Sequence, residues 1–132
     1  MPRATWPLRN GRPVVSVLLT LAATGHQIGC NLLADTGAGV AHVGFEVLLQ
    51  ENDCHRCGGI PAQGVLLGGA YVGSFPVFVI RVQIPALSFD HYVRAVGVPQ
   101  VPTGLDGVAA FRFLNRFTYG NFGMPQQFGL ET

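Results

Sequence analysis

The chain has 132 residues, of which 48% are hydrophobic and 11% are charged, and its formal net charge is +1 at pH 7. This length and apolar content are enough for one domain with a sizeable core. All eight basic residues are arginines and they form no basic run, so we expect no nucleic-acid partner. Because no stretch approaches the ~20 apolar residues that cross a bilayer, we also expect no membrane span.

The composition favours short strands over helices. Eighteen glycines and nine prolines supply turns, and the abundant Val and Phe residues suit strands. Three cysteines cannot close a disulfide set, which favours a reducing compartment and hence a cytoplasmic location. We therefore predict an all-β domain.

The first elements are expected to form a hairpin. Residues 1–12 are rich in Pro and Arg and are predicted to be an irregular arm. The apolar run 14–21 contains several β-branched residues and predicts a strand, and residues 28–34 predict the return strand. The apolar stretch 14–23 also has roughly the length of a signal-peptide core, but the motif described next follows it too closely for a removable leader.

The return strand ends in a single carboxylate, Asp35, within the sequence Leu32-Leu33-Ala34-Asp35-Thr36-Gly37-Ala38-Gly39. Asp is a poor strand residue and the glycines allow unusual backbone angles, so the strand is expected to turn sharply and present this side chain. The pattern resembles the active-site signature of the retropepsin-like aspartic proteases.

The resemblance implies a retropepsin-like single lobe over residues 13–118 with one short C-terminal helix. Asp35 would be the catalytic residue of an endopeptidase that uses water as nucleophile and needs no cofactor. Thr36, Gly37 and Ala38 would support its loop, with the Thr36 hydroxyl crossing to a partner chain. Since the chain carries the motif once, the second carboxylate would come from a homodimer. Gly39 departs from the family, which commonly has Ser, Asp or Thr at this position.

The polar segment 51–61 follows a mixed apolar run at 40–49 that fits either a strand or a short helix. In the family a mobile hairpin, the flap, closes over a peptide or protein substrate, and Cys57, Gly58 and Gly59 are predicted as its tip. Cys54 and Cys57 form a lone Cys-x-x-Cys pair. Ordinary thiols or a local disulfide are the simpler interpretation, while zinc would need further ligands.

Residues 75–83 and 87–96 are predicted strands, and a second landmark begins at Asp106-Gly107. The segment 106–114 resembles the closing motif of bacterial retropepsin-like domains, with Ala110 where the family usually has glycine. Apolar spacing at 113, 114 and 117 predicts a helix over 111–117. Asp106 is the rival partner for Asp35 within one chain, although it is expected to be a structural turn residue. The aromatic tail 119–132 is predicted to dock, and the resemblance implies that it does so at the dimer interface.

Two other functions remain open. One is a catalytically inactive peptide-binding domain on the same fold, which would add a peptide strand to a sheet. The other is a structural module stabilised by zinc at Cys54 and Cys57.

Overall fold

Strands make up most of the regular structure of the computed structural model, which describes residues 1–58, 63–67 and 73–132. The all-β class predicted from composition is confirmed. In chain order the elements are β1 (Arg3–Pro7), β2 (Val14–Thr20), β3 (Gln27–Ala34), β4 (Val47–Gln50), α1 (Glu51–Gly58), β5 (Gln63–Leu67), β6 (Gly73–Ile84), a 3₁₀ turn (Pro85–Leu87), β7 (Phe89–Val98), β8 (Gly107–Ala109), α2 (Phe111–Leu114), β9 (Thr118–Gly120) and β10 (Gln127–Glu131).

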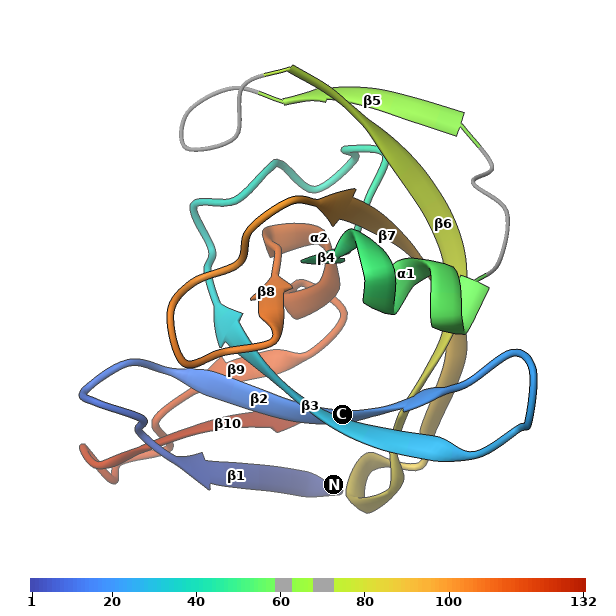
Figure 1. Ribbon diagram of the computed structural model, residues 1–132. Helices are drawn as coiled ribbons and strands as arrows, with labels where there is room; N and C mark the ends of the chain where they lie inside the picture. The colour runs from blue at the N-terminus through green and yellow to red at the C-terminus, as the bar shows by residue number, and fades with distance from the viewer. Residues whose placement is uncertain (59–62, 68–72) are drawn as a thin grey trace.

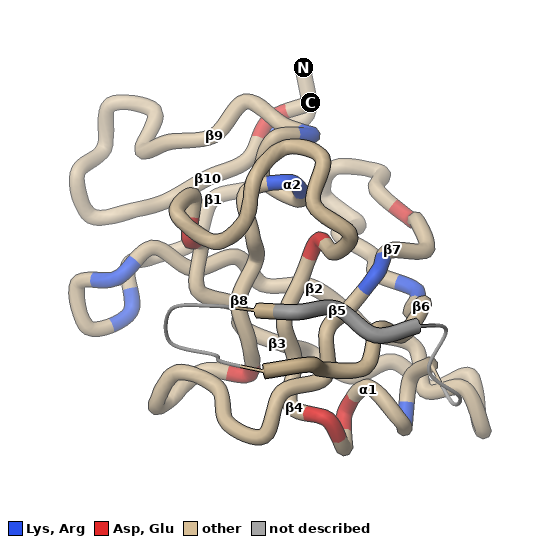
Figure 2. Tube along the Cα trace, turned by 90° about the horizontal axis from the view of Figure 1, so that it is seen from above, with Lys and Arg blue, Asp and Glu red and all other residues tan. Residues whose placement is uncertain are grey.

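Six strands close into a barrel in the order β2-β3-β8-β4-β7-β6, and β6 pairs back with β2 (Figure 1). Most neighbours are antiparallel, but β8 runs parallel to β3 and β4 runs parallel to β7. The strand β5 lies outside this ring and pairs with β6 alone, so the β5–β6 hairpin extends beyond the barrel. Figure 2 looks down on this hairpin, which lies across the barrel.

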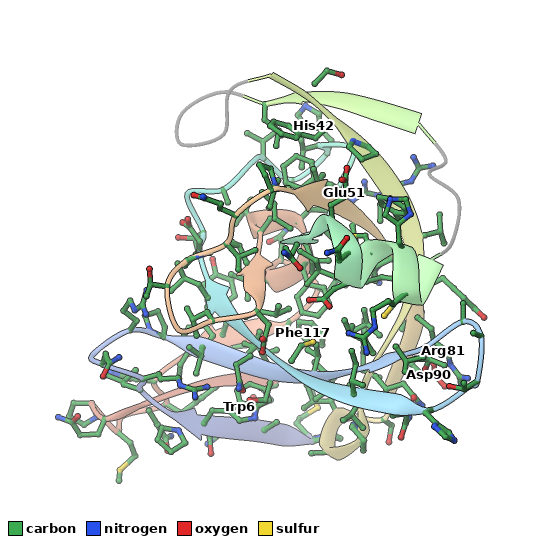
Figure 3. All side chains as sticks on the ribbon, viewed as in Figure 1. Trp6, His42, Glu51, Arg81, Asp90 and Phe117 are labelled. Atoms are coloured by element: carbon green, nitrogen blue, oxygen red, sulfur yellow. The ribbon has the colours of Figure 1, made fainter. Side chains whose placement is uncertain are left out.

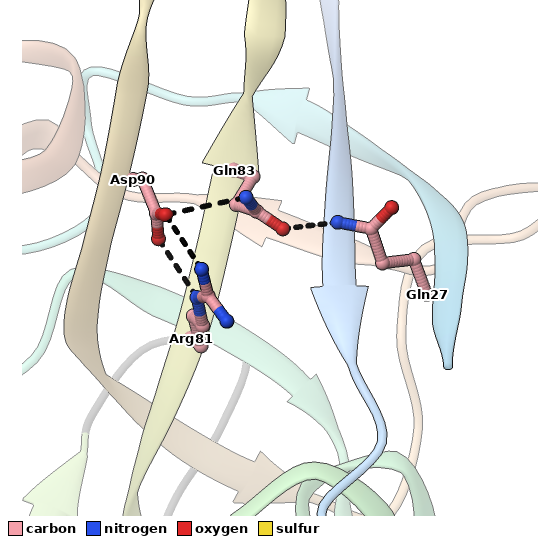
Figure 4. Close-up of polar contacts among 4 residues, drawn as sticks. All are labelled: Gln27, Arg81, Gln83 and Asp90. Carbon is pink, nitrogen blue, oxygen red and sulfur yellow. Dashed lines mark hydrogen bonds and ion pairs between the residues drawn. The ribbon is translucent and has the colours of Figure 1, made fainter. Parts of the chain in front are cut away.

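The seam between β2 and β6 consists of two residue pairs, Leu18 with Gln83 and Leu19 with Val82. Polar side chains support it on the outside (Figure 4). Gln27 of β3 donates to Gln83 of β6, which in turn donates to Asp90 of β7 at 3.3 Å. The Arg81 guanidinium adds two hydrogen bonds of 2.9 and 2.7 Å to the same carboxylate. These hydrogen bonds lower the pKa of Asp90.

Residues 1–12 are not irregular throughout, because β1 pairs with β10, and β10 pairs with β9 (Figure 1). We call β1, β10 and β9 the terminal sheet. The two chain ends lie close together (Figures 1 and 2). The Thr132 amide donates a hydrogen bond to the Pro2 carbonyl at 3.1 Å. Trp6, Tyr119 and Phe128 pack from this sheet against the barrel core, and the buried members of that core include Phe117. Figure 3 labels Trp6 and Phe117. The tail therefore docks, as predicted, but within its own chain.

The segment predicted as a flap tip is helix α1, packed against β4, β6 and β7. Glu51 and Asp53 in its first turn and Arg56 in its last turn complement the helix dipole. Cys57 is buried, and a Cβ at Gly58 would lie 3.0 Å from the Val79 carbonyl oxygen of β6. Cys57 and Gly58 therefore belong to a helix that packs closely on the sheet, and the prediction that they form a hairpin tip was wrong. Gly59 lies outside the described residues.

Charged residues are scattered along the trace without a run of one sign (Figure 2). Within the described ranges, no helix is long and apolar enough to cross a membrane.

Candidate functional site

Asp35 lies where β3 ends beside β8. The last residue of β3, Ala34, pairs with Ala109 in the parallel register, and the Asp35 amide donates to the Ala109 carbonyl at 3.0 Å. The chain then turns, and the Gly37 amide donates to Asp35 Oδ1 at 2.9 Å. A Cβ at Gly37 would lie 3.2 Å from that oxygen, so this position favours glycine. Asp35 as a residue is half-buried, and this hydrogen bond gives its carboxylate a defined orientation.

The loop after Asp35 is attached to the start of α2. The Ala38 amide donates to the Asp35 carbonyl at 3.2 Å, and the Ala38 carbonyl accepts from the Phe111 amide at 2.9 Å. The motif at 32–39 and the closing segment at 106–114, which lie about 70 residues apart, therefore meet at this point. Thr36 is exposed, and its contact with a second chain stays a prediction.

The two departures from the family pattern have structural explanations. Gly39 has a left-handed backbone with φ +75, and a Cβ there would lie 2.9 Å from Val43 Cγ1. Ser, Asp or Thr would be strained at this position. Ala110 has φ −78 and is fully buried before α2, so alanine is not strained there.

Asp106 lies at the far end of the β3–β8 pair from Asp35. Its Oδ2 accepts from the Asn31 amide at 2.8 Å, and its own amide donates to the Asn31 carbonyl at 2.9 Å. Asp35 lies four residues beyond Asn31 along the strand direction, which corresponds to about 13 Å. Asp106 therefore fixes a strand end and does not face Asp35.

The three cysteines are free and buried in the core, Cys30 on β3 and the other two on α1. Burial raises the pKa of Cys30 and Cys54 to about 12 and also raises the pKa of Cys57. Over the part of the chain that the structure describes, no group of three or more His, Cys, Asp or Glu residues could hold a metal ion.

An apolar cluster connects the Asp35 loop with the β5–β6 hairpin. Its buried members are Phe45, Leu48, Val77, Val96, Val98, Val108 and Ala110. From the loop, Ala38 and Val43 pack against it, and from the hairpin, Leu67 and Phe75 pack against it. His42, exposed on the same loop, lies toward the hairpin (Figure 3).

Sequence reasoning missed Glu46, which is only 3% exposed. Its Oε1 accepts from Arg116 Nε at 2.7 Å, and Arg112 Nε lies 3.9 Å from the same oxygen. Neither local pattern nor spacing marks this residue, because its partners lie about 70 positions along the chain.

Comparison with known proteins found no matching family model, no matching curated protein and no matching solved structure.

Proposed function

We propose that this chain is one subunit of a retropepsin-like aspartic endopeptidase. The observation that supports this most is the Asp35 loop. A half-buried aspartate follows a barrel strand, its carboxylate is oriented by the Gly37 amide, and its loop is attached to α2 through the Ala38 carbonyl. Here Gly37, Ala109 and Phe111 all take part in hydrogen bonds to Asp35 or to its loop.

In this proposal two copies of Asp35 face each other across a two-fold axis. Like charges a few ångströms apart do not both ionise cheaply, so the pair shares one proton. The ionised carboxylate takes a proton from water, which attacks the peptide carbonyl carbon. The protonated carboxylate donates to the carbonyl oxygen. The substrate would lie between the Asp35 loop and the β5–β6 hairpin.

The test is hydrolysis of an unfolded protein such as casein. Asp35→Asn is nearly isosteric and should lower the rate by at least about a thousandfold while the fold stays intact. Asp106→Asn is the matched control, because its amide oxygen still accepts from Asn31. Activity that persists in purified Asp35→Asn, or that is lost only in Asp106→Asn, would contradict the proposal.

One observation favours a catalytically inactive peptide-binding domain as the second candidate. The resemblance implies that the termini pair between subunits, whereas here β1 pairs with β10 of its own chain. Asn10 and Gly11 form a tight turn with φ 52 and φ 74 between β1 and β2, which suits this intrachain arrangement. A chain that stays monomeric and binds unfolded casein without cleaving it would support this second function.

A further inference from the structure

A buried carboxylate lies next to the loop that carries Asp35. Among the described residues, Glu46 is the one charged residue that is buried. Its Oε2 is buried without a hydrogen-bond partner. Burying a carboxylate costs free energy that an apolar side chain would avoid. Stability alone therefore does not explain why a carboxylate occupies position 46.

The neighbours of Glu46 suggest that reason. Its carbonyl accepts from the Ala110 amide at 2.9 Å, so the backbone before β4 is attached to the start of α2. Its Oε1 is paired with Arg116, which follows α2. Arg112, on α2 itself, lies near the same oxygen and donates from Nη1 to the Val43 carbonyl at 2.6 Å.

These contacts attach residues 36–46, which we call the strap, at several points. Counting from Asp35, the segment is held to α2 and its flanks at Ala38, Val43 and Glu46. The hydrogen bond at Ala38 is between backbone atoms, whereas those at Val43 and at the Glu46 carboxylate need arginine side chains. Both ends of the strap 36–46 are therefore fixed against the same short helix, and the arginines determine how firmly its second half is held.

We propose that Arg112, Glu46 and Arg116 form a clamp that positions the Asp35 loop for hydrolysis. None of the three contacts the reacting atoms, so they are positioning residues. The inference rests on the proposed endopeptidase function and adds residues that determine how precisely its carboxylate is placed. Because a displacement of about 1 Å can cost about 100-fold in rate, loosening the strap should lower kcat.

The experiment compares Arg112→Ala with Arg112→Lys and with Arg81→Ala in casein or peptide hydrolysis. Arg81 is a matched control, since its side chain is 41% exposed against 38% for Arg112 and it pairs with Asp90 far along the chain from the strap. We expect Arg112→Ala to lower kcat about 10- to 100-fold with little change in KM. Arg112→Lys keeps a donor for the Val43 carbonyl and should recover most of the loss, and Arg81→Ala should match wild type.

A second measurement, amide hydrogen exchange, does not depend on hydrolysis. In Arg112→Ala the Gly37 and Phe111 amides should exchange faster while the barrel strands keep their protection. Glu46→Gln, which keeps the shape and removes the charge, should change both measurements in the same direction. The clamp would be overturned if Arg112→Ala kept the wild-type kcat and the wild-type exchange rates in the loop. It would also be overturned if this variant raised KM alone, or if the amides of the whole barrel lost as much protection as those of the loop. If the wild-type protein hydrolyses nothing, the proposed function fails and hydrogen exchange alone decides whether the clamp exists.

Discussion

Gly39 provides a quantitative test of the loop geometry. A left-handed backbone costs an L-residue about 1–2 kcal/mol. At Gly39 a Cβ would also lie 2.9 Å from Val43 Cγ1, and Val is stiff because it is branched at Cβ. Forcing extra atoms into a packed site costs about 1–3 kcal/mol. Gly39→Ala should therefore lower the free energy of unfolding by about 2–5 kcal/mol.

Gly25 is the matched control, because its φ of +76 nearly equals the +75 of Gly39 and no atom lies within 4 Å of the position that a Cβ would occupy there. Gly25→Ala should cost only the backbone part, about 1–2 kcal/mol. Urea unfolding of both variants measures the difference. Adding Val43→Ala to Gly39→Ala should give a favourable coupling of about 1 kcal/mol or more. Equal costs for the two glycines, or no coupling with Val43, would refute the loop geometry.

Two further predictions concern the barrel. A Cβ at Gly107 would overlap the Leu48 carbonyl oxygen, so Gly107→Ala should displace β4 and cost more than about 3 kcal/mol in urea unfolding. At Gly29 no atom lies within 4 Å of the position that a Cβ would occupy, so Gly29→Ala should change the stability little. Hydrogen bonds from Arg81 lower the pKa of Asp90 in the folded chain. The ion pair therefore stabilises the fold at pH values above the unfolded pKa of about 4. This stabilisation is lost as the pH falls through the folded pKa. Urea midpoints should therefore fall less steeply below about pH 4 in Asp90→Asn than in wild type, and parallel profiles would contradict this.

The elements predicted best from sequence are those with dense apolar patterns. The β-branched run at 14–21 corresponds to β2, and the run at 28–34 corresponds to β3, which ends at Ala34 just before Asp35. The apolar spacing after Ala110 predicted a helix over 111–117, and α2 does begin at Phe111, although it ends already at Leu114. In these segments local propensity and burial favour the same structure.

The elements that were missed depend on contacts distant in sequence. β1 is bounded by prolines and forms because β10 pairs with it across about 120 residues. Helix α1 looked like a flexible break because Gly58 and Gly59 suggest a hinge, although Cys54 and Cys57 have helical spacing. Glu46 is polar in sequence, and its buried carboxylate is paired with Arg116, which lies 70 positions along the chain.

The central claim is that two copies of Asp35 form one site, and mixing wild type with Asp35→Asn tests it most directly. If the subunits exchange and both carboxylates are needed, an equimolar mixture retains about one quarter of the activity of the same total amount of wild type, because only wild-type pairs are active. Specific activity should also rise with protein concentration until dimers saturate. Retention of about one half at every concentration, with a monomer in sedimentation, would contradict the shared site.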